Sequence, residues 1–165
     1  MGLERFAHHL MADIQTRFPK SDVMIWGDPA GGKRDEIFEV TAFDHLRTLG
    51  LRAQPTASND FKVRREAGAM PMNRLIDGRP GLLVSKDCVR TRKSLSGGYH
   101  FKRVAVGAGH ERFKDAPNKN EHSHVGDAYG YLMLGGGEHR ALTRNPNGMP
   151  LYKQAVASTD FNVFA

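Results

Sequence analysis

The chain has 165 residues and a formal net charge of +6; 39% of its residues are hydrophobic and 25% are charged. This size and composition predict one soluble globular domain, and no apolar run reaches the roughly 20 residues that a membrane-spanning helix needs. The first ten residues mix charged and apolar positions without the uninterrupted apolar stretch of a signal peptide, so we expect a cytoplasmic protein without membrane contact. The single cysteine, Cys88, excludes an intramolecular disulfide, and a buried core thiol is its simplest interpretation.

The first third of the chain predicts helices that alternate with short buried strands. Apolar residues at three- and four-residue steps predict a helix from Leu3 to Phe18, which ends before Pro19. The pattern continues with an expected strand, helix and strand over residues 23–26, 37–49 and 51–54. This alternation indicates an α/β fold with a partly parallel sheet.

The rest of the chain continues the alternation less regularly. We expect a helix near 59–76 with a kink at Pro71, and a last helix over 123–134 with Ser123 as its N-cap. Between these two helices the sequence predicts a strand, a helix, an edge or hairpin strand and a polar loop, over 81–84, 87–95, 99–104 and 107–120. The folded domain is expected over residues 1–140, followed by a flexible tail over 141–165.

Positive charge is concentrated in the middle of the chain. Residues 60–105 contain eleven Lys or Arg against four Asp or Glu, a local excess of +7. Such a cluster suits a polyanion like DNA, whose phosphates reward local positive charge through counterion release, although a solvated helix surface explains it equally well. Within and beyond this region, Arg64, Arg65 and Lys119 are the candidates for phosphate contacts.

Residues 27–33 formally match the G-x-x-x-x-G-K phosphate-binding loop and follow a predicted strand. The match fails on mechanism, because Arg34 stands where the loop needs Ser or Thr to hold magnesium. Asp28 would also place a negative charge among the phosphate oxygens. We therefore rank a nucleotide-binding loop low.

Asp28 is instead a candidate metal ligand, because it follows a buried strand at the position where α/β sheets bind their ligands. The competing interpretation is an Asp-Pro turn starter that caps the next turn. Asp127, one turn into the last predicted helix, would border the core, where a carboxylate is costly unless a cation or hydrogen bonds satisfy it. Two such acids can bind Mg²⁺ or Mn²⁺ and serve phosphodiester hydrolysis with two ions.

Other polar residues near these acids have simpler interpretations. His122 and His124 are less suited than oxygen ligands to Mg²⁺ and are expected at a helix start. Asp60 is expected to cap the helix that follows it. Trp26 and Tyr99 are expected to pack in the core rather than to stack on bases.

Several blocks in order resemble the nuclease domain of phage terminase large subunits. They are residues 2–7, 26–31, 59–64, 88 with 97–99, and 118–128, of which Lys119-Asn120-Glu121-His122-Ser123-His124-Val125-Gly126-Asp127-Ala128 is the most specific. The resemblance covers about residues 2–140.

The resemblance implies an RNase H-like mixed sheet flanked by helices and a DNA endonuclease that uses three acids with Mg²⁺ or Mn²⁺. Asp28 matches the second acid and Asp127 the third. The first acid, its strand and the ATPase half have no counterpart here, so the fold is expected to be truncated at its N-terminus. Implied partners are double-stranded DNA, the terminase small subunit and the portal, with self-association through an exposed sheet edge as a further possibility.

Two alternatives remain open beside a cutting nuclease. The chain can be a remnant that binds DNA or packaging partners without cutting. It can also be a stand-alone RNase H-like nuclease whose third carboxylate is Asp60 or Glu36. A structure that places either acid within about 5 Å of both Asp28 and Asp127 would favour the second alternative.

Overall fold

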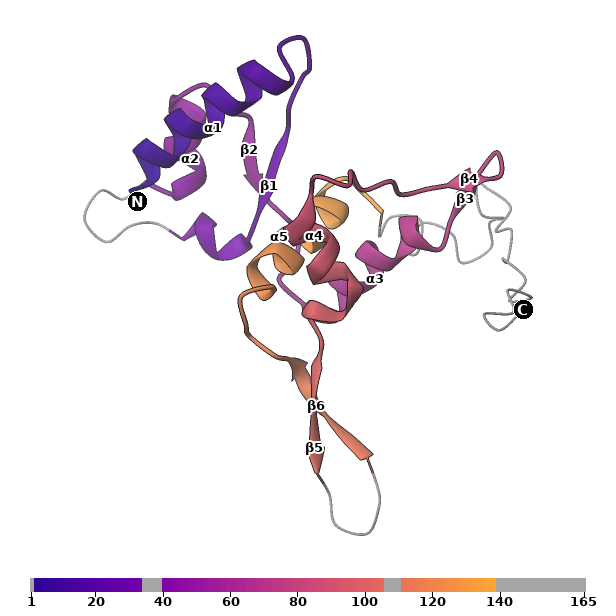
Figure 1. Cartoon of the computed structure of the whole chain (residues 1–165). Coiled ribbons are helices and arrows are strands. Elements are labelled where there is room, and N and C mark those ends of the chain that lie inside the picture. Colours follow the sequence, from indigo (N-terminus) through magenta and orange to yellow (C-terminus); the bar gives the residue numbers. More distant parts are fainter. Residues whose placement is uncertain (1, 34–39, 106–110, 139–165) are drawn as a thin grey trace, which may run out of the picture.

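The computed structural model describes residues 2–33, 40–105 and 111–138 (Figure 1). Its N-terminal part contains two helices and two short strands, in the order α1 (Leu3–Arg17), β1 (Ile25–Gly27), α2 (Ala42–Thr48) and β2 (Ala53–Pro55). β1 and β2 pair in parallel, with Trp26 opposite Gln54. A 3₁₀ turn, η1 (Pro29–Gly32), follows β1 directly.

The core of this part is apolar. Ala7 of α1, Phe43 and Leu46 of α2, Leu51 and Ala53 form one buried cluster. Side chains at these positions recur every three or four residues in the helices, so each helix presents one apolar face to the strands. α2 also begins with a capping box, in which Thr41 and Asp44 satisfy each other's backbone N–H groups.

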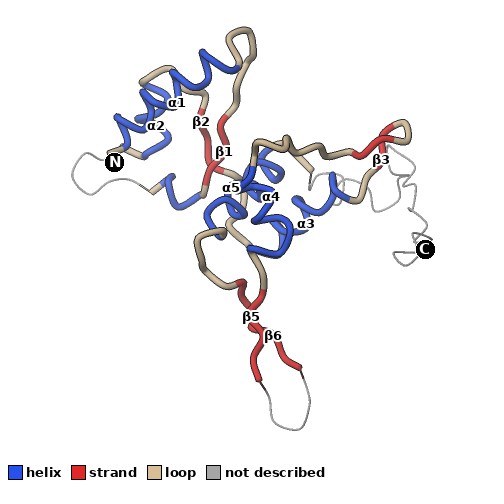
Figure 2. Tube along the Cα trace, viewed as in Figure 1, coloured by secondary structure: helices blue, strands red, loops and turns tan. Residues whose placement is uncertain are grey.

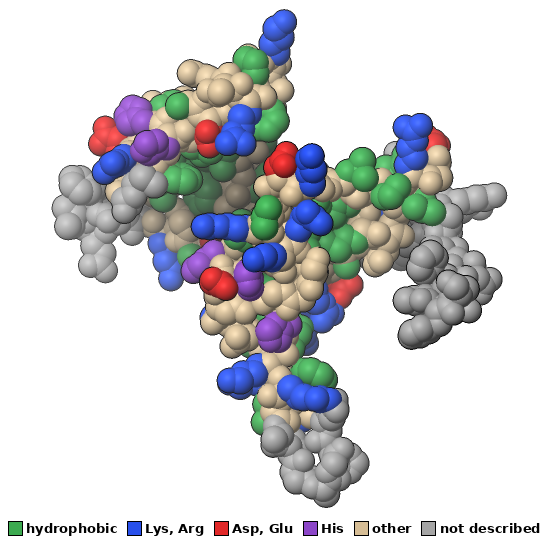
Figure 3. Space-filling view, in the orientation of Figure 1, with side chains coloured by type: hydrophobic (Ala, Val, Ile, Leu, Met, Phe, Trp, Pro, Cys, Tyr) green, Lys and Arg blue, Asp and Glu red, His purple; other side chains and the backbone are tan. Residues whose placement is uncertain are grey.

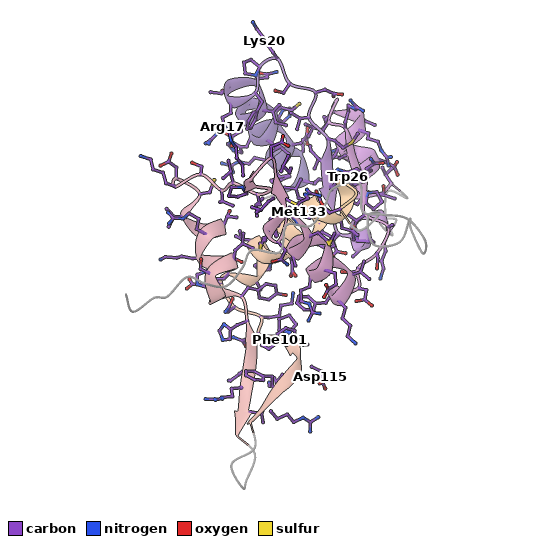
Figure 4. The ribbon with its side chains drawn as sticks, turned by 90° about the vertical axis from the view of Figure 1, so that its right-hand side faces the viewer. Arg17, Lys20, Trp26, Phe101, Asp115 and Met133 are labelled. Carbon is purple, nitrogen blue, oxygen red and sulfur yellow. The ribbon has the colours of Figure 1, made fainter. Side chains whose placement is uncertain are left out.

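The second part is a group of helices, α3 (Phe61–Met72), α4 (Val89–Lys93) and α5 (Ser123–Gly135), which lies beside the N-terminal part (Figures 1 and 2). A single π-type turn, η2 (Ser94–Gly98), extends α4. Its helical geometry breaks at Gly97, whose φ of +102° is a conformation that favours glycine. α5 joins the two parts, because the ring of Trp26 packs directly on the backbone at Gly135 (Figure 4).

Two hairpins complete the described chain. β3 (Leu75–Ile76) and β4 (Arg79–Pro80) form a minimal antiparallel pair. β5 (Phe101–Ala105) and β6 (Glu111–Pro117) form a longer one, which projects away from the rest of the molecule (Figure 1). Among the helices within the described ranges, none is long and apolar enough to cross a membrane.

Several predictions are confirmed. The first helix, the strands near 23–26 and 51–54, their parallel pairing, the edge or hairpin strand near 99–104 and the last helix are present within a few residues of the expected bounds. Asp60 is the N-cap of α3, where its carboxylate accepts hydrogen bonds from the Lys62 and Val63 N–H groups. The predicted tail over 141–165 and the candidate acid Glu36 lie outside the described residues.

Other predictions are wrong, each for a local reason. Residues 81–84 form no strand: Leu82 and Val84 are partly buried and Leu83 is 82% exposed, but none of the described strands pairs with this run. The expected polar loop contains β6, whose residues 112–116 are all exposed and therefore carry no apolar alternation. Ser123 is not an N-cap; it lies inside α5, is buried, and donates to the Asn120 carbonyl. Cys88 is exposed rather than buried.

Candidate functional site

Asp28 lies between β1 and η1 and caps the turn that follows. Its Oδ1 accepts a hydrogen bond from the Ala30 N–H at 2.9 Å. The glycines on either side allow close packing, because a Cβ at Gly27 or Gly31 would lie 3.1 or 3.0 Å from the Phe43 ring. The Gly-Asp-Pro-Ala-Gly pattern therefore has a packing explanation, and a phosphate here would compete with Asp28 for the Ala30 N–H.

Asp127 is almost enclosed, with a side chain that is 17% exposed, and both of its oxygens accept hydrogen bonds. Oδ1 accepts hydrogen bonds from Arg64 Nη1 at 2.7 Å and from the Tyr99 hydroxyl at 3.0 Å, while Oδ2 accepts one from Lys119 Nζ at 2.5 Å. Three segments far apart in the sequence thus converge on one carboxylate. This arrangement satisfies the charge that the sequence predicted to be costly near the core.

These contacts set the protonation of the cluster. Burial raises the pKa of Asp127, but hydrogen bonds from Lys119, Arg64 and Tyr99 outweigh it and hold the pKa below its usual value. The pKa of Lys119 is raised, chiefly by its hydrogen bond to Asp127. Burial, followed by the bond to Asp127, raises the pKa of Tyr99. At neutral pH the carboxylate and the ammonium group are therefore charged and the phenol is neutral.

The charges of both Asp28 and Asp127 affect Tyr131, which lies on α5 one turn after Asp127. It is buried, 7% exposed, and its hydroxyl donates to Asn59 Oδ1 at 2.5 Å. Burial raises the pKa of Tyr131 above its usual value, and the negative charges of Asp28 and Asp127 raise it further against the opposing charge of Arg64. The Arg64 guanidinium lies over the Tyr131 ring, with its central carbon 4.5 Å from the ring centroid. Both candidate acids therefore act on one phenol.

The close approach of α3 to α5 builds this cluster. A Cβ at Gly68 would lie 2.9 Å from the Tyr129 ring, and a Cβ at Gly130 would lie 3.2 Å from the Cβ of Arg64. Tyr129 donates its hydroxyl to the Gly68 carbonyl at 2.8 Å, and burial raises its pKa to about 12. The small residues let Arg64 reach Asp127 across the helix interface.

A mostly apolar cavity of about 230 Å³ lies next to the cluster, between α3, η2, α5 and the base of the β5–β6 hairpin. Phe61, Met72, Leu95 and Tyr99 are among its lining residues, and Arg64 and Asp127 form part of its wall. Its apolar lining is unsuited to a hard cation, which prefers oxygen ligands. The oxygen donors of the candidate site are the two carboxylates themselves.

No third acid joins them in the part of the chain that the structure describes: no group of three or more His, Cys, Asp or Glu there is placed to hold a metal ion. Asp60 caps α3 instead of completing a triad. His122 lies 3.5 Å from the exposed carboxylate of Glu121, and His124 is exposed.

The candidate DNA-contacting residues differ in exposure. Arg64 is only 7% exposed and supports Asp127, so little of its surface is available to a phosphate. Arg65 is exposed and pairs with the neighbouring Glu66. Lys119 is 67% exposed while it contacts Asp127. Basic side chains also surround the end of α4 in Figure 3, from Arg90, Arg92 and Lys93.

Sequence reasoning singled out Asp28, Asp127, Arg64 and Lys119, assigned Tyr99 to packing and did not single out Tyr131. Tyr131 follows Asp127 by four residues, so both lie on the same face of α5, and this spacing was the available signal. Nothing in the spacing of Tyr99 indicates its hydroxyl contact with Asp127. A comparison of the chain with protein-family models, curated proteins and solved structures found no match.

Proposed function

We propose that the chain is the nuclease part of a phage DNA-packaging terminase large subunit, with an RNase H-like fold. It would cleave concatemeric duplex DNA in the host cytoplasm, together with the small subunit and the portal. The observation that carries the proposal is that Asp28, at a strand end, and Asp127, on α5, both act through their charge on one buried phenol, Tyr131, which lies one helical turn after Asp127.

The donor set suits Mg²⁺ or Mn²⁺, because two carboxylates from different elements supply hard oxygen ligands. Arg64 and Lys119 both pair with Asp127, so a cation would compete with Lys119 for Oδ2 of Asp127. Lys119 can give up its contact with Asp127 and remain hydrated, because its side chain is 67% exposed. The enclosed side chain of Arg64 could not. Asp28 and Asp127 would therefore hold the metal, with Arg64 retained.

When bound, a pair of such ions would activate the attacking water and stabilise the leaving oxygen. The chain's own residues prepare the site. Arg64 and Tyr99 fix the orientation of Asp127 through Oδ1, and Tyr131 donates its hydroxyl to Asn59. Lys119, once released from Asp127, is placed to neutralise a DNA phosphate beside the carboxylates.

The test is Mn²⁺-dependent nicking of supercoiled plasmid by the purified chain. We expect Asp28→Asn and Asp127→Asn to reduce nicking to the level of a protein-free blank. Asp13→Asn is the matched control, because this carboxylate is 68% exposed and lies on α1. Nicking that survives both site variants would refute the assignment of the two acids.

A second candidate function is supported by a specific observation. Both oxygens of Asp127 are occupied by the chain's own donors, and the described residues provide no third acid. These features favour a remnant that binds DNA or packaging partners without cutting. Absence of nicking, with intact and salt-sensitive duplex binding, would select this function.

A further inference from the structure

The β5–β6 hairpin extends from the molecule as an isolated two-stranded ribbon (Figures 1 and 2). All its described side chains between Lys102 and Val104, and between Arg112 and Ala116, are exposed. An exposed ribbon of this kind gains little stability from its own packing, since isolated hairpins are marginally stable in water. Its projection therefore calls for an explanation other than core formation.

The ribbon is basic. Its two strands contain Lys102, Arg103, Arg112 and Lys114 against Glu111 and Asp115. Val104 pairs with Arg112, and Lys102 alternates with Arg103, so Lys102, Val104 and Arg112 project from one face, while Lys114 and Asp115 lie in the stretch of β6 where the register shifts. Figure 3 shows basic side chains on both sides of the projection and no acidic one on the face in view.

The base of the ribbon is attached to the candidate site. Phe101 packs edge-on against Phe61 of α3, with ring centroids 5.6 Å apart. Tyr99, just before β5, and Lys119, just after β6, both donate to the carboxylate of Asp127. A ligand bound along the ribbon would therefore extend toward Asp127.

We propose that the β5–β6 ribbon is a contact surface for duplex DNA. The ribbon inserts into a groove of the duplex and pairs its Lys and Arg side chains with the flanking phosphates. A two-stranded ribbon fits the major groove, which is about 12 Å wide. Cations exposed on both strands can reach the phosphates on either side of that groove. The inference deepens the proposed function and rests on it only for the identity of the polyanion.

The test measures binding of a short fluorescein-labelled duplex by fluorescence anisotropy in EDTA, over a range of KCl concentrations. The ribbon variant is Lys102→Gln/Arg112→Gln/Lys114→Gln. The matched control, Arg5→Gln/Arg17→Gln/Lys20→Gln, removes the same net charge from exposed sites in α1 and just after it, and Arg17 and Lys20 lie at the end of the molecule opposite the ribbon (Figure 4). All six residues are exposed, and circular dichroism checks that both variants remain folded.

If each ribbon side chain neutralises one phosphate, the ribbon variant loses affinity about 100-fold near physiological salt, and its salt dependence falls by about 2.7 in logarithmic slope. We expect the control to bind within about threefold of the unmodified chain, because its charges lie far from the ribbon. Equal losses in the two variants would overturn the proposal. So would equal binding of single-stranded DNA or RNA, which would exclude a duplex groove as the target.

The assay separates this inference from the proposed function, because no metal is present and no cleavage is required. Loss of binding in the ribbon variant, combined with no plasmid nicking by the unmodified chain, would support the ribbon and refute the nuclease. Nicking that depends on Asp28 and Asp127, combined with unchanged binding by the ribbon variant, would refute the ribbon alone.

Discussion

The two parts of the molecule are stabilised by different interactions. The N-terminal part packs Phe43, Leu46 and Leu51 into an apolar cluster, and the salt bridges described there are exposed. The α3–α5 part instead buries Arg64 and Asp127 as an ion pair, with side chains 8% and 17% exposed. Periodic apolar residues made the first part predictable from sequence, whereas the second depends on one carboxylate whose partners come from three separate segments.

The largest expected loss of stability comes from Phe43→Ala in the apolar part. Phe43 is 6% exposed and its ring contacts the backbone at Gly27 and Gly31. Removing it leaves a cavity and should lower the free energy of unfolding by about 3–4 kcal/mol, measured by urea denaturation. Phe18→Ala is the control, since Phe18 is 54% exposed and should cost less than about 1 kcal/mol. Equal costs would show that the apolar cluster does not hold this part together.

Arg64→Met tests the charged part. It leaves Asp127 without its enclosed partner and should cost about 3 kcal/mol, because breaking a buried ion pair strands the remaining charge. Arg65→Met, at an exposed neighbouring arginine, should change stability by less than about 1 kcal/mol.

The double variant Arg64→Met/Asp127→Leu sharpens this comparison. Replacing both members of a buried pair with apolar side chains is often close to neutral, so we expect it to recover most of the stability that Arg64→Met loses. Additive losses in the double variant would instead indicate that Arg64 stabilises α3 and α5 mainly by its contact with the Tyr131 ring.

The fold was predictable where burial imposes a period. α1, β1, β2 and α5 each have an apolar face or run, and their positions followed from it. β6 was missed because a strand that projects into solvent has no buried face to mark it. The apolar run at 81–84 gave the opposite error, since an apolar run forms a strand only where another strand pairs with it, and none of the described strands does so here.

The candidate site was predictable only in part. Asp28 and Asp127 were identified by their position at a strand end and on a helix, and the charges of both raise the pKa of Tyr131. Their partners were not foreseen in these roles, because hydrogen bonds from Arg64 and Tyr99 to Asp127 depend on how α3 and the start of β5 pack on α5. Long-range packing of this kind leaves no pattern in local sequence spacing.

The smallest expected effect is that of Lys119→Met, which removes the exposed donor from Asp127. Lys119 is 67% exposed, so its ion pair should contribute at most about 1 kcal/mol, and the contribution should shrink in high salt. The loss caused by Arg64→Met should persist at the same salt concentration, because that pair is enclosed. Unfolding free energies at low and high KCl compare the two.

Acid should also remove the contribution of Lys119 to the free energy of unfolding. The pKa of folded Asp127 lies below its ordinary value of 3.8, so its charged form stabilises the fold above that value, and this contribution is lost as pH falls through the folded pKa. The difference between the unmodified chain and Lys119→Met should therefore be constant near neutral pH and disappear in acid below 3.8. A difference that persists there would mean that Lys119 stabilises the molecule through its contact with the Tyr99 ring, 5.8 Å away, and not through Asp127.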